Sequence, residues 1–509
     1  MHERTSDPEE IDEYHAGSPI GERSVHVVSN REPYSHEFED GEIVVSRPAG
    51  GLTSALDPVL QSIDGTWIAW GSGEADDVVV DDSDHVAVPP DDPSYDIRRV
   101  WLSEDELSGY YYGFSNQVLW PVFHGFPSKA NYSESFFTTY RDVNERFASV
   151  VLEEIESEDP IVWFHDYHFG LAPGFINDRL PESATLAQFW HIPWPPYDVF
   201  TRCPHGRAVL EGVLENDIVA VHTAADRDRL VHGARTELDA NFDSTTGTIT
   251  NDGDRTDLRV APLPVDVEPF QRDPPASDGP TFWEEVSDRH DLETGTVAVG
   301  VDRLDYTKGI IERLDALARL WERSPEYRGE LTYVQKASES RSHIDAYREY
   351  QDAVRDRVDG INDRFGTSDW RPIVFRDTMI SQPELGELYR NADVALVTPR
   401  RDGLNLVAKE FVAAQDESPG VLVLGEAAGV TEEFGEHALT VTPLQTGGFA
   451  ETIREAIEMP PAERRRRMRA LTNVVRELDE ETWIERVFGY SGESDGVGEL
   501  SHEKHAFVR

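Results

Sequence analysis

The sequence predicts an α/β protein with two lobes of similar size. Short runs rich in Val, Ile and aromatic residues alternate with segments whose apolar residues recur at helical spacing. This alternation is typical of a parallel sheet covered by helices on both faces. It stops at residues 271–280, which are rich in Pro, Asp and Ser, and then restarts. We therefore expect an acidic, disordered segment over 1–22, lobes over 23–275 and 276–475, and a loose tail over 491–509.

The first lobe is expected to hold a series of buried strands. Residues 43–63 add a strand, a glycine loop and a helix, and apolar spacing predicts a long helix over 136–157. The expected strands are 24–30, 66–71, 161–168, 185–194, 217–223 and 259–265.

The second lobe repeats the alternation with little interruption. Its expected strands are 296–305, 329–337, 372–377, 393–399 and 420–425, and its expected helices are 308–325, 344–361, 383–392 and 405–415.

The charge balance excludes several classes of function. The chain of 509 residues has 98 acidic and 47 basic residues, a formal net charge of −51, and only five lysines. Such a charge repels nucleic acid and anionic membranes, so neither is an expected partner. An acidic, lysine-poor surface predicts adaptation to a salty cytoplasm, where ions screen the charge. It also makes each lysine a candidate for a specific role.

Targeting signals and cysteine chemistry are not expected. There is no apolar run long enough to span a membrane, and the acidic start, MHERTSDPEE, is unlike a secretory signal. These features predict a cytoplasmic protein. Cys203 is the single cysteine, which excludes an intramolecular disulfide and a cysteine-rich zinc site.

Two segments have features of phosphate-binding sites. Gly50 and Gly51 separate a strand from a helix start, where backbone N–H groups can approach a phosphate. Taken alone, these glycines are more often explained by a tight turn. Arg303 ends a strand and Lys308 follows five residues later, so two cations flank a strand–helix turn. Such a pair suits a diphosphate, although salt bridges to nearby acids are the alternative.

A third segment, TPRRDGLNLVAKE, joins a strand to a helix. Ligands of parallel sheets bind at such strand ends, and Asp402 offers acceptors for sugar hydroxyls. Glu410 lies about one turn into the helix, beside Lys409. A loop with a helix cap is the structural alternative.

The HDYH segment at 165–168 is not predicted to bind a metal. Its spacing lacks clear third and fourth ligands, so Asp166 is interpreted as a hydroxyl acceptor at a strand end. His191 also ends a strand, and a buried core histidine is as good an explanation as a functional one. The G-x-S-x-G motif of nucleophilic hydrolases is absent from the sequence.

Taken together, the motifs resemble the trehalose-6-phosphate synthase family of retaining glycosyltransferases. The matching segments are VVSNREP, RPAGGL, YYYGFSNQVLWPVFH, IVWFHDYH, WHIPWPPYDVF, GVLENDIVAVHT, DRLDYTKG, LVTPRRDGLNLVAKEF and PGVLVL. Their order and spacing hold from about residue 25 to 485.

The resemblance implies two Rossmann-like lobes facing a cleft, the GT-B arrangement, with an acceptor domain first and a nucleotide-sugar domain second. It also implies a C-terminal helix, 476–490, that returns to the first lobe. The implied reaction transfers glucose from a nucleotide-diphosphate glucose, with UDP-glucose the first choice, to glucose 6-phosphate, giving α,α-trehalose 6-phosphate. No metal and no cofactor are implied. A separate phosphatase is expected downstream, and a homo-oligomer is left open.

The resemblance also assigns roles to individual residues. The implied catalytic residues are Arg303, Lys308, Asp402 and His191. The other implied donor contacts are Gly50, Gly51, Ile380, Gly403, Leu404, Asn405, Leu406, Val407, Ala408, Lys409 and Glu410. The implied acceptor contacts are Arg31, Tyr111, Trp120, Asp166 and Arg341.

Two alternatives remain open at this point. A sister transferase of the same fold would use another phosphorylated acceptor, such as glycerol 3-phosphate. A non-catalytic sensor would bind sugar phosphate and regulate a partner, but it would be expected to lose the donor cations or the Asp402 loop.

Overall fold

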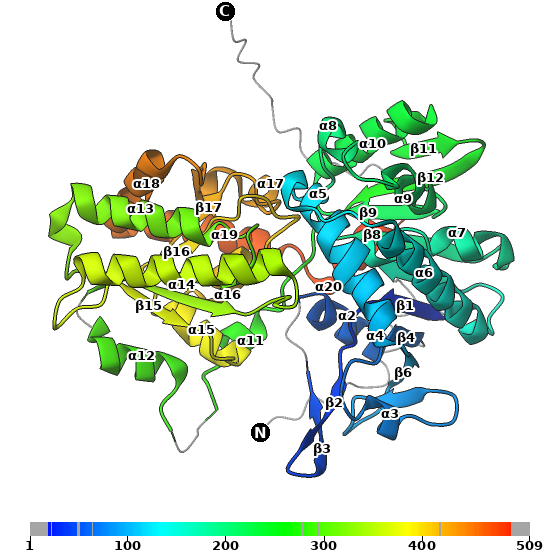
Figure 1. Cartoon of the computed structure of the whole chain (residues 1–509), viewed down its shortest axis with the longest axis horizontal. Helices are drawn as coiled ribbons and strands as arrows, with labels where there is room; N and C mark the ends of the chain where they lie inside the picture. The colour runs from blue at the N-terminus through cyan, green and yellow to red at the C-terminus, as the bar shows by residue number, and fades with distance from the viewer. Residues whose placement is uncertain are drawn as a thin grey trace, which may run out of the picture.

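The computed structural model describes residues 19–21, 23–47, 51–63, 65–275, 279–292, 295–416 and 419–489. The expected disordered segment 1–22 (19–21 aside) and the expected loose tail 491–509 lie outside these residues, as does Gly50. The described chain forms two lobes, each built on one large sheet (Figure 1).

The N-terminal lobe contains a ten-stranded sheet whose order is β10-β11-β12-β9-β8-β7-β1-β4-β6-β5. The seven strands from β12 to β6 run parallel, and antiparallel strands complete both edges. The strands are β1 (Val25–Ser29), β4 (Gly65–Trp70), β5 (His85–Val88), β6 (Tyr95–Val100), β7 (Ile161–His165), β8 (Thr185–Trp190), β9 (Ile218–Val221), β10 (Asn241–Asp243), β11 (Thr248–Asn251) and β12 (Asp254–Val260).

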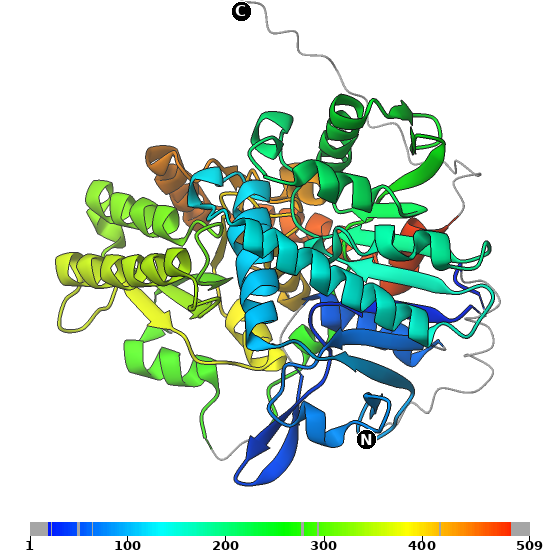
Figure 2. The same cartoon turned by 45° about the vertical axis from the view of Figure 1, so that its right-hand side comes forward.

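Helices cover this sheet, with α6 and the helix η1 lying side by side in front of it in Figure 2. η1 (Ser108–Leu119) is a π-helix. The α-helices of the lobe are α2 (Gly51–Gln61), α3 (Asp76–Val79), α4 (Glu104–Leu107), α5 (Trp120–Phe123), α6 (Glu134–Glu154), α7 (Pro173–Ile176), α8 (Tyr197–Phe200), α9 (Gly206–Val213) and α10 (Ala224–Leu238).

The C-terminal lobe contains a six-stranded, fully parallel sheet of order β15-β14-β13-β16-β17-β18. Its strands are β13 (Thr296–Arg303), β14 (Leu331–Ser338), β15 (Ile373–Arg376), β16 (Val394–Val397), β17 (Val421–Gly425) and β18 (Leu439–Val441). Its helices are α11 (Glu268–Gln271), α12 (Phe282–His290), α13 (Ile310–Arg323), α14 (Asp345–Phe365), α15 (Gln382–Arg390), α16 (Leu406–Ala414), α17 (Thr431–Phe434), α18 (Thr446–Glu458) and α19 (Pro461–Arg476).

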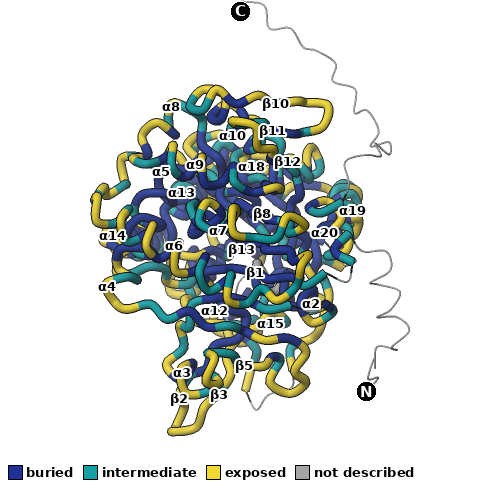
Figure 3. The backbone as a smooth tube through the Cα atoms, turned by 90° about the vertical axis from the view of Figure 1, so that its right-hand side faces the viewer, coloured by how far each residue is buried: buried dark blue, intermediate teal, exposed yellow. Residues whose placement is uncertain are grey.

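The central strands of both sheets are buried, and exposed residues lie on the outer helices and loops (Figure 3). Helix α13 shows how the sequence produces this layering. Ile310, Leu314, Leu317 and Trp321 recur at helical spacing, and all four are fully buried. Among the described residues, no helix is both long and apolar enough to cross a membrane.

Helix α20 (Glu480–Phe488) follows α19 and packs against the N-terminal lobe. The ring centroid of Trp483 lies 5.1 Å from that of Trp163, and its indole N–H donates to the carbonyl of Ala261 at 3.1 Å. The end of the chain therefore ties the second lobe to the first.

One local prediction needs correction. The strand expected at 259–265 ends at Val260, because Pro262 and Pro264 have no N–H to donate to a sheet. The strand expected at the start of 43–63 is present as β3 (Glu42–Ser46), which pairs with β2 (Ser35–Glu39) in a hairpin outside the large sheets.

Candidate active site between the two lobes

In each sheet the strand order reverses beside the first strand of the lobe. β1 lies between β4 and β7, and β13 lies between β14 and β16. Ligands of such sheets bind beyond the carboxyl ends of the strands at these points. Four residues singled out in the sequence lie there: Arg31 after β1, Asp166 after β7, Arg303 at the end of β13 and Asp402 after β16.

Lys308 and Asp402 are brought together by the two loops of the second lobe. The Lys308 ammonium group bonds to the Asp402 carboxylate, and the Asn405 amide donates to the same oxygen at 3.0 Å. Burial would raise the pKa of Asp402, but the charge of Lys308 outweighs burial and lowers this pKa. The site thus keeps an ionised carboxylate beside a lysine.

A buried arginine holds these two loops in place. The Arg313 guanidinium donates to Asp302 at 2.6 Å, to the Thr398 hydroxyl at 3.1 Å and to the Lys308 carbonyl at 3.4 Å. Gly309 has φ +68°, and a Cβ there would collide with the Thr398 carbonyl. The close approach of the loops after β13 and β16 therefore requires glycine at this position.

The ring of Trp120 lies near two arginines that come from different loops of the second lobe. Trp120 itself comes from α5 of the first lobe and is buried. The Cζ atom of Arg341 lies 4.1 Å from the ring centroid, and that of Arg303 lies 5.5 Å from it. Both distances are within the range of a cation–π interaction.

Arg341 is held by three further groups. Its guanidinium donates to the hydroxyls of Tyr347 at 2.7 Å and Tyr167 at 3.3 Å, and lies 3.5 Å from a carboxylate oxygen of Asp305. Its side chain is only 7% exposed, and its backbone adopts the left-handed region at φ +52°. Because non-glycine residues rarely adopt this conformation, the strained backbone is consistent with a functional site.

Glu339 lies two residues before Arg341 but does not neutralise it. Its carboxylate accepts bonds from Arg355 and from the Ser342 hydroxyl. The carboxylate paired with Arg341 is therefore that of Asp305 and not that of Glu339.

Arg31 and Tyr111 complete this positive region from the first lobe. The Arg31 guanidinium donates to the Tyr111 hydroxyl at 3.4 Å, and the Tyr111 ring stacks on His168 with centroids 5.8 Å apart. Burial would raise the pKa of Tyr111, but the charges of Arg341 and Arg31 outweigh it and lower this pKa to about 8.

Asp166 lies at the end of β7 with φ +73°. Its carboxylate accepts the backbone N–H groups of Tyr167 at 2.9 Å and His191 at 3.2 Å. Burial raises the pKa of Asp166 to about 7. These bonds aim the carboxylate, and burial makes its charge sensitive to pH near neutrality.

His191 is the centre of a row of three imidazoles. Its Nε2 lies 3.1 Å from Nδ1 of His165, and its Nδ1 lies 3.2 Å from Nε2 of His222. Burial lowers the pKa of His191 to about 3 and lowers those of its two neighbours well below their ordinary value, so the row is uncharged at neutral pH. Each link then needs one donor and one acceptor, so the tautomers of the three rings are coupled and the His191 ring is held in one orientation.

The sequence analysis missed two histidines of this site, His222 and His124. The His124 ring centroid lies 4.0 Å from that of Trp120, and its Nδ1 lies 2.8 Å from the Trp120 carbonyl. Burial lowers the pKa of His124 to about 4. The sequence could have indicated both histidines. His124 ends the segment WPVFH, which contains the predicted site residue Trp120, and His222 directly follows the apolar run IVAV of the predicted strand 217–223.

Helix α16 carries two of the expected donor residues in different ways. The Glu410 carboxylate accepts from the Tyr389 hydroxyl at 3.1 Å, and burial raises the pKa of Glu410 to about 7. The Lys409 ammonium group instead bonds to the Leu263 carbonyl at 2.7 Å and to Glu433 at 2.8 Å. The side chain of Lys409 is thus used inside the protein, in an ion pair.

The remaining expected donor contacts lie around the same loop. A Cβ on Gly403 would collide with the carbonyl oxygen of His191, so the two lobes approach closely here. Leu404 is buried, and its carbonyl accepts the N–H of Val430 at 2.9 Å. Gly51 begins α2, Ala408 is buried, and the partly buried residues are Ile380, Leu406 and Val407.

Two positively charged regions therefore flank Trp120 in a chain of strong negative charge. Lys308 and Arg303 form one, and Arg341 and Arg31 form the other. Within the described residues, no group of three or more His, Cys, Asp or Glu side chains is arranged to hold a metal ion. The geometry suits two separate phosphate-bearing ligands.

Known proteins show the same architecture. A trehalose-6-phosphate synthase of Mycobacterium sp. (strain KMS) is 34% identical over 475 residues, which cover 92% of this chain and 94% of the relative. A bifunctional trehalose-6-phosphate synthase/phosphatase of Thermoproteus tenax is 36% identical over 488 residues. These cover 90% of this chain but only 62% of that longer relative.

Solved structures of trehalose-phosphate synthases are similar to this chain over most of its length. An E. coli structure, described as trehalose-6-phosphate bound with UDP-2-fluoro glucose, superposes with a TM-score of 0.80 at 30% identity, over 91% of this chain and 97% of that one. The α,α-trehalose-phosphate synthase (UDP-forming) of Burkholderia xenovorans, in complex with glucose-6-phosphate, gives 0.79 at 30% identity over 91% and 98%. The predicted α/β fold of GT-B type is confirmed.

The resemblance seen in the motifs is confirmed by a family model as well, which matches residues 23–490. The chain belongs to glycosyltransferase family 20.

Proposed function

We propose that this glycosyltransferase transfers glucose from a nucleotide-diphosphate glucose to glucose 6-phosphate. UDP-glucose is the proposed donor, because the similar Burkholderia enzyme is described as UDP-forming. The product is α,α-trehalose 6-phosphate with retained anomeric configuration.

The observation that carries this proposal is the contact of Trp120 with both Arg303 and Arg341. A transferase that joins a nucleotide sugar to a sugar phosphate must hold two anionic groups with the reacting sugars between them. Two pairs of cations that meet at one aromatic ring suit that requirement.

On the donor side, Lys308 and Arg303 stabilise the diphosphate as it leaves. Negative charge builds on its oxygens while the glycosidic bond breaks, and fixed cations lower that barrier by about 3–4 kcal/mol for a key donor. Asp402 lies beside Lys308 and offers acceptors to the donor sugar. The hydrogen bond from Asn405 fixes the orientation of the Asp402 carboxylate. Glu410, further along α16, is the proposed partner of the ribose hydroxyls.

On the acceptor side, Arg341 and Arg31 hold the phosphate of glucose 6-phosphate. A guanidinium group can give two parallel N–H bonds to a phosphate dianion. Tyr111 adds a hydroxyl between them, while Trp120 and Asp166 meet the acceptor sugar. The proposal gives Asp166 the task of orienting the attacking hydroxyl.

We propose that the attacking hydroxyl approaches on the face from which the diphosphate departs. The departing phosphate oxygen then takes the hydroxyl proton, and no carboxylate forms a covalent intermediate. His191 lies beside the Gly403 loop, and its neighbours His165 and His222 hold its ring in one orientation. A fixed ring of this kind can position the donor sugar without a change of charge.

Several wider expectations belong to the same proposal. The partners are small molecules, with no nucleic acid and no membrane. A separate phosphatase that removes the phosphate from the product is a further part of the proposal. A cytoplasmic location and a homo-oligomer are parts of the proposal that need their own measurements.

The test is a matrix of initial rates for three donors and three acceptors. UDP-, GDP- and ADP-glucose are each paired with glucose 6-phosphate, glycerol 3-phosphate and free glucose, without and with a chelator. We expect transfer to glucose 6-phosphate, little to free glucose, and no effect of the chelator. Transfer to glycerol 3-phosphate alone would identify a sister transferase, and binding without turnover would identify a sensor.

A further inference from the structure

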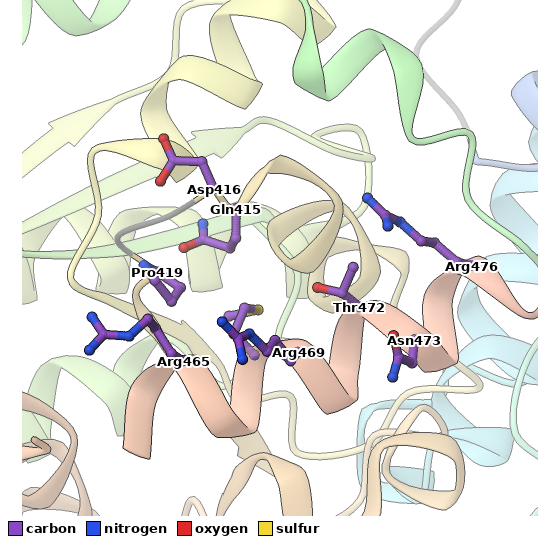
Figure 4. Close-up of a pocket in the computed structure, with 9 residues that line it drawn as sticks. Gln415, Asp416, Pro419, Arg465, Arg469, Thr472, Asn473 and Arg476 are labelled. Atoms are coloured by element: carbon purple, nitrogen blue, oxygen red, sulfur yellow. The ribbon is translucent and has the colours of Figure 1, made fainter. Parts of the chain in front are cut away.

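A pocket lined by three arginines and one carboxylate, that of Asp416, lies on the C-terminal lobe, away from the site between the lobes (Figure 4). Its volume is about 250 Å³, and one face of α19 forms its floor. It is called the α19 pocket below. Its lining residues are Gln415, Asp416, Pro419, Arg465, Met468, Arg469, Thr472, Asn473 and Arg476.

The arginines of α19 divide into two groups. Arg464 donates to the backbone carbonyls of Met459 and Ile457, and Arg466 and Arg467 bond to Glu463. These three arginines have structural partners and do not line the pocket.

The arginines that line the pocket are different. Within the part of the chain that the structure describes, Arg465, Arg469 and Arg476 make no side-chain hydrogen bond and no ion pair. The chain has 98 acidic residues available as partners. These three guanidinium groups are exposed around one hollow, where their charges attract an anion.

The spacing of these arginines indicates the size of the ligand. Residues four, seven and eleven positions apart lie on one face of a helix, because each turn has about 3.6 residues. At about 1.5 Å per residue, Arg465 and Arg469 are separated by about 6 Å along the axis, and Arg469 and Arg476 by about 10 Å. The first pair can hold one phosphate group together, while Arg476 reaches a second anionic group.

Polar uncharged groups fill the space between the arginines. Thr472 offers a hydroxyl and Asn473 an amide, both suited to the hydroxyls of a small organic molecule, and Met468 gives an apolar contact at the base. Figure 4 shows the side chains of Arg469 and Thr472 on the pocket side of the helix. The pocket is large enough for a metabolite and too small for a folded partner to enter.

The pocket also lies at the far end of the proposed donor helix. Gln415 follows α16, and its amide donates to the Tyr389 carbonyl at 2.9 Å, while the Tyr389 hydroxyl bonds to Glu410. The side-chain oxygen of Gln415 accepts the N–H of Gly420 at 2.7 Å. A ligand in the pocket therefore lies against a residue that is linked to α16.

We propose that the α19 pocket binds a small phosphorylated metabolite with two anionic groups, separately from the substrates. Arg465 and Arg469 bind one phosphate group, Arg476 binds the second anionic group, and Thr472 and Asn473 bond to the part between them.

Titration calorimetry with inorganic pyrophosphate, at two KCl concentrations, tests this proposal in four proteins. The wild type should show two classes of site, one in the α19 pocket and one formed by the donor and acceptor cations between the lobes. The double variant Arg465→Gln/Arg469→Gln should lose the pocket class, with binding at least tenfold weaker, and keep the other. The double variant Arg303→Gln/Lys308→Gln should weaken the class between the lobes, where Arg341 and Arg31 remain, and keep the pocket class. The matched control Arg466→Gln changes an ion-paired arginine on the same helix and should keep both classes.

Three results would overturn the proposal. The first is a pocket variant that melts like the wild type and binds pyrophosphate in both classes with unchanged affinity. The second is inorganic phosphate binding to the pocket as tightly as pyrophosphate does, which would exclude a two-anion site. The third is a wild-type dimer, seen by light scattering, that the pocket variant loses while its pyrophosphate binding is unchanged. Glucose transfer by the same variant, assayed in parallel, keeps this outcome separate from that of the proposed function.

Discussion

Trp120 contacts both of the cations on which the proposed reaction depends. Its ring is near Arg303 on the donor side and near Arg341 on the acceptor side, and His124 covers it further. Because the protein carries a net charge of −51, anionic substrates gain affinity only where such cations are concentrated. The substitutions below test the two sides separately.

Replacing Lys308 or Arg303 by Ala should lower kcat/KM by roughly 100-fold or more, since each stabilises charge on the leaving group. Steady-state kinetics with saturating acceptor measure this effect. Arg454→Ala is the control, because Arg454 is paired with Glu451 and Glu458 on the surface. Wild-type turnover in either site variant would refute the diphosphate assignment.

Replacing Arg341 by Ala should raise the KM for glucose 6-phosphate at least tenfold and leave the donor KM nearly unchanged. A guanidinium that pairs with a phosphate contributes to binding of that substrate alone. The control is Arg355→Ala, which frees Glu339 without touching Arg341. If the acceptor KM stays constant in Arg341→Ala and rises only in Arg31→Ala, other groups hold the phosphate.

The acceptor KM should depend on pH through Asp166. Its pKa is raised to about 7, so the carboxylate is ionised above pH 7 and protonated below it. Protonation removes a hydroxyl acceptor, and we expect the KM for glucose 6-phosphate to rise as the pH falls from 8 to 6. Asp166→Asn should have a high KM throughout, with only the pH dependence of the substrate itself. Parallel profiles for the two proteins would contradict this role.

At the scale of elements, the loop after β16 must touch the first lobe for the site to form. Gly403 contacts the backbone of His191, and Gly429 contacts the backbone of Gly403, so there is no space for a side chain at either glycine. This packing places the donor loop and the end of β8 at a fixed distance.

Gly403→Ala should therefore lower kcat/KM by roughly tenfold or more, because the new methyl group pushes the lobes apart. Kinetics together with a melting curve measure this change. Gly360→Ala, on α14 with open space around it, is the matched control and should leave activity unchanged. Full activity in Gly403→Ala would show that the lobes need not approach this closely.

The sequence was a good guide to the elements that have a simple pattern. Buried strands such as β7 and β16 are continuous apolar runs, and α13 has an apolar stripe at helical spacing. The strands also end where the charged site residues begin. This is why Arg303, Asp402 and Asp166 could be placed at the carboxyl ends of strands before the structure was known.

The remaining features depend on contacts between distant segments. The π-helix η1 places Tyr111, and the Asn116 amide donates to the Tyr111 carbonyl at 2.8 Å inside it. No local pattern distinguishes such a helix from an α-helix. Likewise, His222 becomes part of the site only because β9 lies beside β8. The Lys409 side chain bonds to Glu433, 24 residues away. The small number of lysines in the sequence had instead suggested that Lys409 contacts a substrate.

For the whole molecule, electrostatic repulsion is the dominant feature. The Debye length falls from about 10 Å at 0.1 M salt to about 3 Å at 1 M, so salt should weaken the repulsion within the folded chain. We expect the melting temperature and the activity to rise from 0.1 M to molar KCl. NaCl should give the same trend, since screening depends on ionic strength. A flat or falling melting temperature would contradict the proposed adaptation to salt.

Both lobes are proposed to cooperate in joining a donor glucose to the sugar of glucose 6-phosphate. The most direct test is the NMR spectrum of the product formed from UDP-glucose and glucose 6-phosphate. We expect a 1,1-linked disaccharide phosphate with both anomeric centres in the α configuration, together with one equivalent of UDP. A β linkage at the transferred glucose, or release of free glucose without a disaccharide, would contradict the proposed reaction.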